Sequence, residues 1–231
     1  MTTGYKATYN YKCRDQIYEI GKEYKLDEKP ILCEKGFHYC LNPKDTLDHY
    51  SLNKDFKLLQ ILDLNPNETQ TDKKVSCSNH IEIIREITNK EEQLLLIGQS
   101  WNYDQITRVL RIENVNTDWF KYSFNEQDNM TEYKESSGYW YNYTYNENGN
   151  VVDYRESNGN FYEYTYNKDG KVLTYKDQDC WTKYTYNDNN QIISYEDSDG
   201  FSYTQTYDEN GYKLTYKDNY ELIFKTGTKN D

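Results

Sequence analysis

Aromatic and polar residues alternate along the second half of the chain. In residues 139–145, YWYNYTY, a tyrosine stands at every second position and Trp140 falls between two of them. Residues 161–166, FYEYTY, repeat the alternation. Because successive side chains of a strand point to opposite faces, this pattern predicts β-strands with one tyrosine face. Tyr143 and Tyr164 are predicted on that face, and Trp140 on the other.

These strands recur with a period of 20 or 21 residues. An aromatic anchor stands at Phe124, Tyr145, Tyr166, Tyr186 and Tyr207, and a second anchor follows nine residues after each. Turn formers such as Asn148-Gly149 and Asp169-Gly170 separate the anchors, and such pairs tolerate the positive φ of hairpin turns. Residues 118–231 are therefore predicted to be an all-β antiparallel meander of five hairpins with a closing strand.

The repeat sequences resemble a known family. The segments YTYNENGNVVDYRESNG (143–159) and YTYNKDGKVLTYKDQD (164–179) resemble the tyrosine-aspartate (YD) repeats of RHS proteins. The resemblance covers about half of the chain. It implies a fold of stacked hairpins and does not imply an activity.

The first hundred residues mix strand and helix signals. Strands are expected at 4–9, 23–26, 36–40, 56–64 and 80–87. Asn42-Pro43 is typical of a helix start, and Thr88–Glu91 of a capping box before a helix that ends at Gly98. These signals predict an α+β domain over 1–100, followed by a junction or an initial half-repeat over 101–117.

Charge separates the two halves. The chain has a net charge of -12; residues 1–115 hold 16 Lys/Arg against 18 Asp/Glu, and residues 116–231 hold 11 against 21. This acidity argues against direct binding of nucleic acid. Five irregularly spaced cysteines indicate reduced thiols and no metal site. The chain lacks a run of 18 apolar residues and a signal sequence, so a bacterial cytoplasmic location without membrane contact is expected.

Two further resemblances concern the N-terminal half. The pattern from YKATYNYKCRDQIYEIGKEY to GFHYCLNPKDTLDHY, within residues 4–87, is similar to an uncharacterised domain common in phage and prophage proteins. The same segments resemble arginine-serine-glutamate ADP-ribosyltransferases. That resemblance implies that Arg14 holds NAD phosphates and that Glu82 or Glu86 lies near the catalytic glutamate. Residues 38–40, His-Tyr-Cys, replace the Ser-Thr-Ser motif, so a degenerate scaffold without a cofactor is expected.

The motifs therefore favour a non-enzymatic protein that binds a partner. An acidic sheet bearing tyrosine and tryptophan suits a basic protein surface, such as that of a defence nuclease. The function expected first is inhibition of a host defence factor, as anti-CRISPR proteins do. The alternatives are ADP-ribosyl transfer to a host target and an immunity-type partner of a toxin; turn acids that only keep the hairpins soluble are the simplest interpretation. No basic-aromatic strip is expected. The predicted partner-binding residues are Trp140, Tyr143, Glu147, Tyr164, Asp169, Trp181, Asp188 and Glu209.

Overall fold

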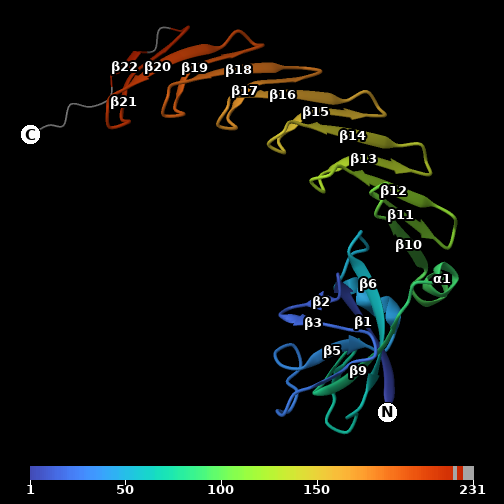
Figure 1. Cartoon of the computed structure of the whole chain (residues 1–231). Coiled ribbons are helices and arrows are strands. Elements are labelled where there is room, and N and C mark those ends of the chain that lie inside the picture. Colours follow the sequence, from blue (N-terminus) through green and yellow to red (C-terminus); the bar gives the residue numbers. More distant parts are fainter. Residues whose placement is uncertain (221–222, 226–231) are drawn as a thin grey trace, which may run out of the picture. The chain divides into compact units, whose positions relative to one another are not determined.

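The computed structural model describes residues 1–220 and 223–225. The chain divides into two compact units, residues 1–121 and 122–231 (Figure 1). The described residues contain one α-helix and one 3-10 helix, and the other regular elements are strands. The expected α+β class of the N-terminal domain is therefore corrected to a mainly β domain, because both helices are short pieces between strands.

The N-terminal unit is built on a nine-stranded antiparallel sheet. Its main path runs in the order β4-β9-β6-β1-β5-β8-β7, and the small β2–β3 hairpin extends from β1. The strands are β1 (Thr2–Tyr9), β2 (Lys12–Cys13), β3 (Gln16–Ile17), β4 (Glu23–Lys25), β5 (Phe37–Cys40), β6 (Phe56–Asp63), β7 (Gln70–Asp72), β8 (Val75–Ser78) and β9 (His80–Glu86). The five strands expected from the sequence are all present.

Each face of this sheet carries its own hydrophobic cluster. Leu59, Ile61 and Ile83 pack with buried aromatic rings on one face. Phe56 and Leu58 pack on the other, together with residues from β1 and α1. Alternating β6 residues thus fill two cores, as the pleat of a strand requires.

The two helices begin at asparagine caps. The 3-10 helix η1 (Pro43–Asp48) starts after Asn42, whose side chain accepts from the backbone N–H of Lys44. The α-helix α1 (Lys90–Ile97) starts after Asn89, whose side chain accepts from the N–H of Glu92. The predicted start at Thr88 was therefore one residue early, because Asn89 caps in its place. The helix ends at Gly98, which adopts a left-handed φ of 74°.

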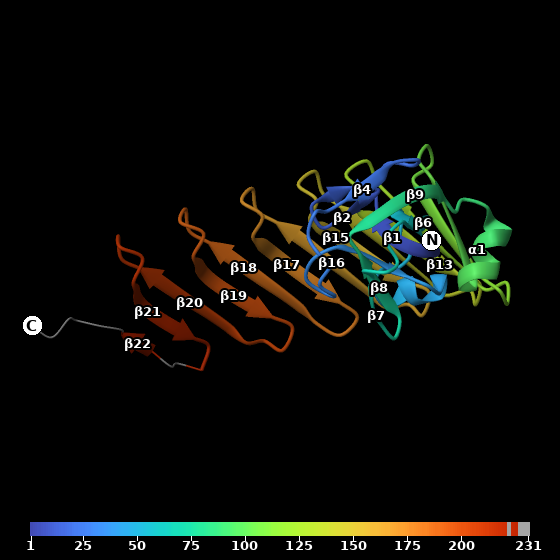
Figure 2. The same cartoon turned by 90° about the horizontal axis from the view of Figure 1, so that it is seen from below.

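The second sheet has thirteen strands paired in sequence order, β10 to β22. Figure 2 shows β16 to β21 side by side. The predicted antiparallel meander is confirmed, with β10 and β11 as an additional hairpin before it. The strands are β10 (Gln99–Asp104), β11 (Val109–Asn114), β12 (Trp119–Phe124), β13 (Met130–Glu135), β14 (Trp140–Tyr145), β15 (Val151–Glu156), β16 (Phe161–Tyr166), β17 (Val172–Asp177), β18 (Trp181–Tyr186), β19 (Ile192–Asp197), β20 (Ser202–Tyr207), β21 (Lys213–Asp218) and β22 (Ile223–Lys225).

The turn within each repeat begins at an asparagine or aspartate whose side chain accepts from backbone N–H groups of the turn. The Asn146 side-chain oxygen accepts from the N–H groups of Asn148 and Asn150, both at 3.0 Å. Gly149 then adopts a φ of 79°. Asn190 takes the equivalent place two repeats later with a φ of 59°, which asparagine tolerates better than most residues. The turn chemistry read from the sequence thus determines the hairpin ends.

The tyrosine face forms a ladder of rings across most of the repeats. The centroids of Tyr143 and Tyr154 are 5.0 Å apart, and Tyr164 and Tyr175 repeat this distance. Such aromatic pairs stabilise a sheet by about 0.5–1.5 kcal/mol each beyond their buried area. The rings of the repeat sheet can therefore contribute to holding its strands together.

Candidate functional site

A pocket opens in the N-terminal sheet where β1 and β5 part. Strand β1 pairs with β6 along its whole length, from Thr2 to Tyr9. It pairs with β5 only through Tyr5 and Cys40. The opening has a volume of about 510 Å³ and is lined by β1, β5, the β2–β3 hairpin and the segment around η1. This volume is within the range of small-molecule sites.

The floor of the pocket holds a buried cation. Lys6 is only 4% exposed, and its amine donates to the carbonyl oxygen of His38 at 2.7 Å. Its Nζ atom also lies 5.1 Å from the centre of the Tyr18 ring. Burial lowers the pKa of Lys6, and the adjacent Cys13 thiol opposes this shift. The other ionisable groups that act most strongly on Lys6 are the thiols of Cys13 and Cys77 and the guanidinium of Arg14. An anion bound beside this buried amine would favour its charged form.

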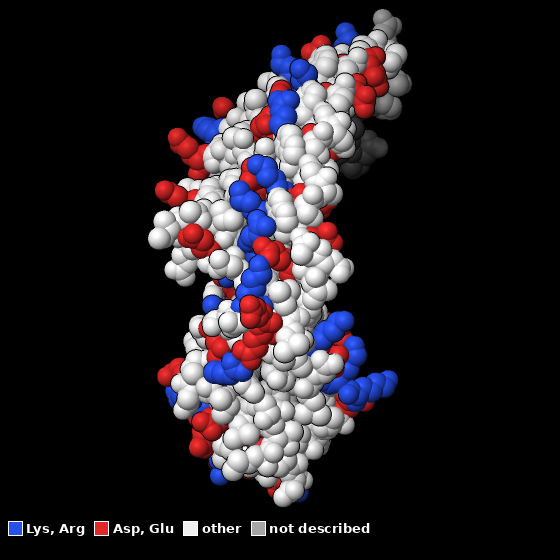
Figure 3. All heavy atoms as spheres, turned by 90° about the vertical axis from the view of Figure 1, so that its right-hand side faces the viewer, with Lys and Arg blue, Asp and Glu red and all other residues white. Residues whose placement is uncertain are grey.

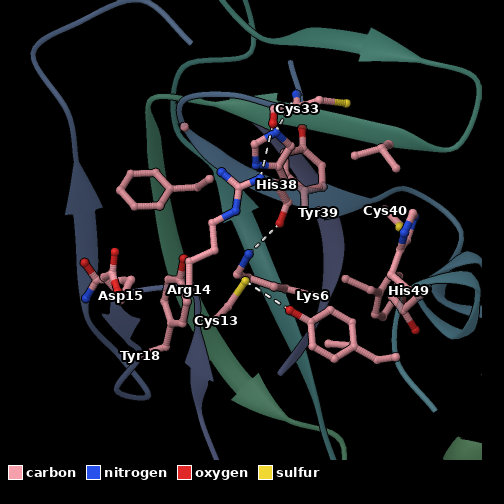
Figure 4. A pocket seen from close by; sticks show the side chains of 18 of the residues that line it. Lys6, Cys13, Arg14, Asp15, Tyr18, Cys33, His38, Tyr39, Cys40 and His49 are labelled. Atoms are coloured by element: carbon pink, nitrogen blue, oxygen red, sulfur yellow. Dashed lines mark hydrogen bonds between the residues drawn. The ribbon is translucent and has the colours of Figure 1, made fainter. Parts of the chain in front are cut away.

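Arg14 closes the mouth of the pocket. It lies in the β2–β3 turn with a positive φ of 53°. Its guanidinium donates to the carbonyl oxygens of Glu34 at 2.9 Å and Cys33 at 3.2 Å. The N–H of Cys33 in turn donates to Nε2 of His38 at 2.8 Å, as Figure 4 shows. The loop at 31–36 is thereby tied across the pocket by two side chains.

His38 and the Cys40 thiol are held in their neutral forms. Burial, followed by the charges of Lys6 and Arg14, lowers the pKa of His38. This agrees with its role as an acceptor toward Cys33. Burial also raises the pKa of the Cys40 thiol to about 11. A protonated thiol is a poor nucleophile, so Cys40 is not suited to covalent catalysis at neutral pH.

Aromatic rings form the walls of the pocket. Tyr18, Phe37, Tyr39 and Tyr50 line it, and the Tyr50 hydroxyl lies 3.1 Å from the Cys13 sulfur. Asp15 is the one carboxylate among the lining residues. With cations at the floor and the mouth, this arrangement suits a ligand that carries both negative charge and a planar ring.

One pocket wall rests on a buried carboxylate. Asp63 is fully buried and accepts from the hydroxyls of Tyr39 and Ser78, both at 2.8 Å. It also accepts from the hydroxyl of Thr69 and the N–H of Asn65. Burial alone would raise the pKa of Asp63, but these donors hold it below its ordinary value. Asp63 thereby fixes the Tyr39 ring in the wall.

Only some of the residues singled out by the transferase resemblance lie together at the pocket. Arg14 and the β5 residues His38, Tyr39 and Cys40 line the pocket. Glu82 and Glu86 do not. Glu82 stands in β9 opposite Glu23 and Leu62, and Glu86 accepts from the Tyr11 hydroxyl at 2.5 Å. Strand β8, which does pair with β5, reads Val-Ser-Cys-Ser and carries no acid.

Sequence reasoning missed Lys6. A lysine in an alternating strand is usually taken as a solvent-facing residue. The sequence carried no direct signal of its burial: Gly4 and Thr8 share its face, and only the structure shows that they are buried.

The predicted partner-binding residues lie on three separate surfaces. Tyr143 and Tyr164 belong to the tyrosine ladder, whereas Trp140 and Trp181 lie on the opposite face of the repeat sheet. The four acids lie in exposed turns at the same end of the repeat strands, because each of these turns joins the first strand of a repeat to its second strand. These acids are Glu147, Asp169, Asp188 and Glu209.

The face opposite the tyrosines carries Lys and Arg side chains beside aromatic rings, and acidic side chains of the same face pair with several of these cations. The register places Lys134 opposite Trp140 and Lys176 opposite Trp181. The Arg155 guanidinium lies 4.7 Å from the centre of the Phe161 ring. Figure 3 shows Lys and Arg side chains gathered in a band over the repeat strands, with Asp and Glu beside them. The expectation of no basic-aromatic strip missed this pairing, because residues five or six positions apart in sequence become cross-strand neighbours.

Within the described residues, no group of three His, Cys, Asp or Glu side chains is arranged to hold a metal ion. All five cysteines are free thiols. None of the helices in the described part of the chain is long and apolar enough to span a membrane.

The N-terminal part of the chain matches a family model. Residues 2–95 match the family model "Domain of unknown function (DUF7666)". This agrees with the expected uncharacterised N-terminal domain. No curated protein matches the chain.

Among solved structures, the chain is similar to Tc toxin components. It matches the crystal structure of TcdB2-TccC3 with 11% identity and a TM-score of 0.37, covering 73% of this chain and 10% of that one. It matches the Photorhabdus luminescens Tc holotoxin pore with 11% identity and a TM-score of 0.33, covering 71% of this chain and 10% of the other. The chain thus spans about a tenth of the length of these proteins.

Proposed function

We propose that the N-terminal domain binds a small anionic ligand of the nucleotide class, and that the chain acts by binding and not by catalysis. The observation that carries this proposal is the buried Lys6 ammonium at the floor of a ring-lined pocket. The repeats then serve as the surface that contacts a protein partner.

The charge of the pocket supports an anionic ligand. An ammonium has three donors, and Lys6 uses one of them on the His38 carbonyl oxygen. A guanidinium has five, and two of its nitrogens in Arg14 are bound to backbone oxygens. Donors therefore remain at both the floor and the mouth of the pocket. A phosphate group is the anion that such donors hold best.

The walls and the transferase resemblance favour a nucleotide over a simple anion. Tyr18, Phe37 and Tyr50 offer ring faces and edges along the pocket. The resemblance assigns Arg14 to the phosphates of NAD, and Arg14 is a pocket residue. NAD and ADP-ribose are therefore the first ligands to test.

Binding is proposed ahead of transfer because the pocket lacks the acid that the resemblance requires. Neither Glu82 nor Glu86 is a lining residue. ADP-ribosyl transfer remains the second candidate, supported by the placement of Arg14 and β5 on one pocket.

For the repeats we propose a basic protein as partner. The biological task that we propose is inhibition of a defence factor of the bacterial host of a phage. The specific observation that favours a basic partner is the row of exposed turn acids at one end of the repeat strands. Opposite charges would accelerate the encounter by about 10- to 1000-fold at low salt. The test is capture from a bacterial lysate with the natural chain and with all four turn acids reversed to lysine. A partner that is retained equally by both forms contradicts this part of the proposal.

The nucleotide proposal is tested by thermal unfolding with a ligand panel. ADP-ribose, NAD and ADP should raise the midpoint temperature, whereas adenosine and inorganic phosphate at equal concentration should raise it less. A ligand at 100 times its Kd stabilises the native state by about 2.7 kcal/mol. An unchanged midpoint with every member of the panel contradicts the proposal. Release of nicotinamide from NAD would instead support the enzymatic alternative.

A further inference from the structure

The tyrosine ladder contains one missing ring. In three repeats, a tyrosine of one hairpin stacks on a tyrosine of the next hairpin directly across the strand pair. Tyr133 and Tyr141 stack at 4.8 Å and 18°. Tyr154 and Tyr162 stack at 4.5 Å and 12°, and Tyr195 and Tyr203 at 5.3 Å and 18°.

The remaining pair breaks this rule. Tyr175 of β17 stands opposite Thr182 of β18, in the register that the tyrosine pairs use elsewhere. Threonine covers far less of the neighbouring ring than a phenol does. Tyr175 therefore has an uncovered ring face where Tyr133, Tyr154 and Tyr195 have a stacked partner.

The missing ring leaves an open groove on the tyrosine face. The groove has a volume of about 520 Å³, and its walls come from β16, β17 and β18 together with the turn before β17. Tyr164, Tyr175, Tyr184 and Tyr186 contribute rings to it, and Thr182 is at its floor. Lys171 is the one charged residue in the lining.

We propose that this groove binds a tyrosine side chain presented by an acidic segment of a partner protein. The guest phenol takes the place that Tyr141, Tyr162 and Tyr203 fill in the other repeats, stacked on Tyr175. The walls are preformed because the flanking hairpins fix Tyr164 and Tyr184.

A hydroxylated ring fits better than a plain one. In the complete repeat, Tyr143 and Tyr162 both pack against Tyr154, with centroid distances of 5.0 and 4.5 Å. Burial and then the neighbouring Tyr143 hydroxyl raise the pKa of Tyr162. Tyr164 is the equivalent of Tyr143 one repeat later, and it lines the groove. A guest phenol can therefore pair with the Tyr164 hydroxyl as Tyr162 pairs with Tyr143.

The charge of the groove favours an acidic residue next to the bound tyrosine. Lys171 is exposed beside the groove and is its only charged group. An ammonium at this place favours a carboxylate next to the guest tyrosine. The ligand class is thus an acidic, tyrosine-bearing peptide segment.

The proposal is tested with N-acetyl-tyrosine as the probe, which carries a phenol and a carboxylate. We expect saturable changes in the amide NMR signals of residues 170–175 and 182–186 of the full chain. N-acetyl-phenylalanine should bind more weakly, because it lacks the hydroxyl. Absence of saturable changes at probe concentrations of about 10 mM, or equal changes at the filled pair of Tyr154 and Tyr162, would overturn the proposal.

Two matched substitutions distinguish binding in the groove from nonspecific binding to the tyrosine face. Thr182→Tyr supplies the missing ring and should weaken probe binding by at least tenfold. Thr185→Tyr adds the same ring three residues later on the opposite face and should leave binding within twofold. If the amide spectrum of Thr182→Tyr shows that its fold is disturbed, Lys171→Gln is used in its place. Lys171→Gln should weaken the binding of N-acetyl-tyrosine but not that of N-acetyl-tyrosinamide, which lacks the carboxylate. Unchanged affinity in the folded variant contradicts the proposal.

Discussion

The amine of Lys6 bridges to the carbonyl oxygen of His38 at 2.7 Å, across the gap where β1 leaves β5. This contact satisfies one donor of the buried amine, and the Cys13 thiol also interacts with it. It also links a charged group to the strand that carries three further lining residues, Phe37, Tyr39 and Cys40. The ligand-binding role proposed for the domain depends on this arrangement.

Replacing Lys6 by methionine should stabilise the domain. The change removes a buried charge and keeps a side chain of similar length, so the free energy of unfolding at pH 7 should rise by about 1 to 3 kcal/mol. Burial lowers the pKa of Lys6 in the native state, so the unfolded chain binds more protons between that pKa and 10.5. The advantage of the variant should therefore shrink as the pH rises toward 10.5. Denaturant unfolding at several pH values measures it, and a variant that is less stable at pH 7 would show that the bond to His38 outweighs the cost of burial.

The repeats should lose stability in alkali as the ladder ionises. The hydrogen bond to Asp177, followed by burial, raises the pKa of Tyr175 to about 12. Burial, followed by the bond to Asp197, does the same for Tyr195. A raised phenol pKa contributes stability that is complete below pH 10 and is lost as the pH rises through about 12. Tyrosinate absorbance should therefore rise well above pH 10, in the same pH range as unfolding. A complete rise near pH 10 in the folded protein would contradict the ring ladder.

Asp63→Asn should destabilise the N-terminal domain by about 2 to 4 kcal/mol, because an amide cannot accept from all the donors that surround this carboxylate. The hydrogen bonds hold the pKa of Asp63 below its ordinary value, so the stability it contributes is present above about pH 4. It is lost as the pH falls through the native pKa. Urea unfolding at pH 7 and pH 3 checks both statements, and a loss that is equal at the two values would argue against the charge as its source.

Tyr143→Ala and Glu147→Lys should act on different properties of the repeats. Tyr143 packs on Tyr154 with a centroid distance of 5.0 Å, and its truncation should cost about 2 to 4 kcal/mol. Glu147 lies in an exposed turn, so its reversal should change stability by no more than about 0.5 kcal/mol. Thermal unfolding of the two variants makes the comparison. Equal midpoints would show that the ring ladder does not hold the sheet.

The repeat fold could be read from the sequence because its information is local. Alternation determines which face each residue occupies, and the turn pair Asn148-Gly149 determines where the strand reverses. The opposite face was harder to interpret. Lys176 and Trp181 are polar and aromatic residues five positions apart, and only the cross-strand register makes them neighbours.

The N-terminal pocket depends on pairings between distant segments, and sequence patterns do not encode these directly. Arg14 was singled out through a family resemblance and is a pocket residue. Lys6 was not singled out, because its burial arises from β6 and β5 closing around β1. Glu82 was misplaced for the same reason: the strand next to β5 is β8, not β9.

Calorimetric titration of ADP-ribose into the natural chain and its Lys6→Met variant tests the central claim most directly. Lys168→Met, a change of an exposed turn lysine in the repeats, is the matched control. We predict one site per chain, with binding weakened about 10- to 100-fold by Lys6→Met and unchanged by Lys168→Met, as expected for one lost charge-assisted hydrogen bond. Equal affinity of the natural chain and Lys6→Met, or no heat of binding to the natural chain, would contradict it.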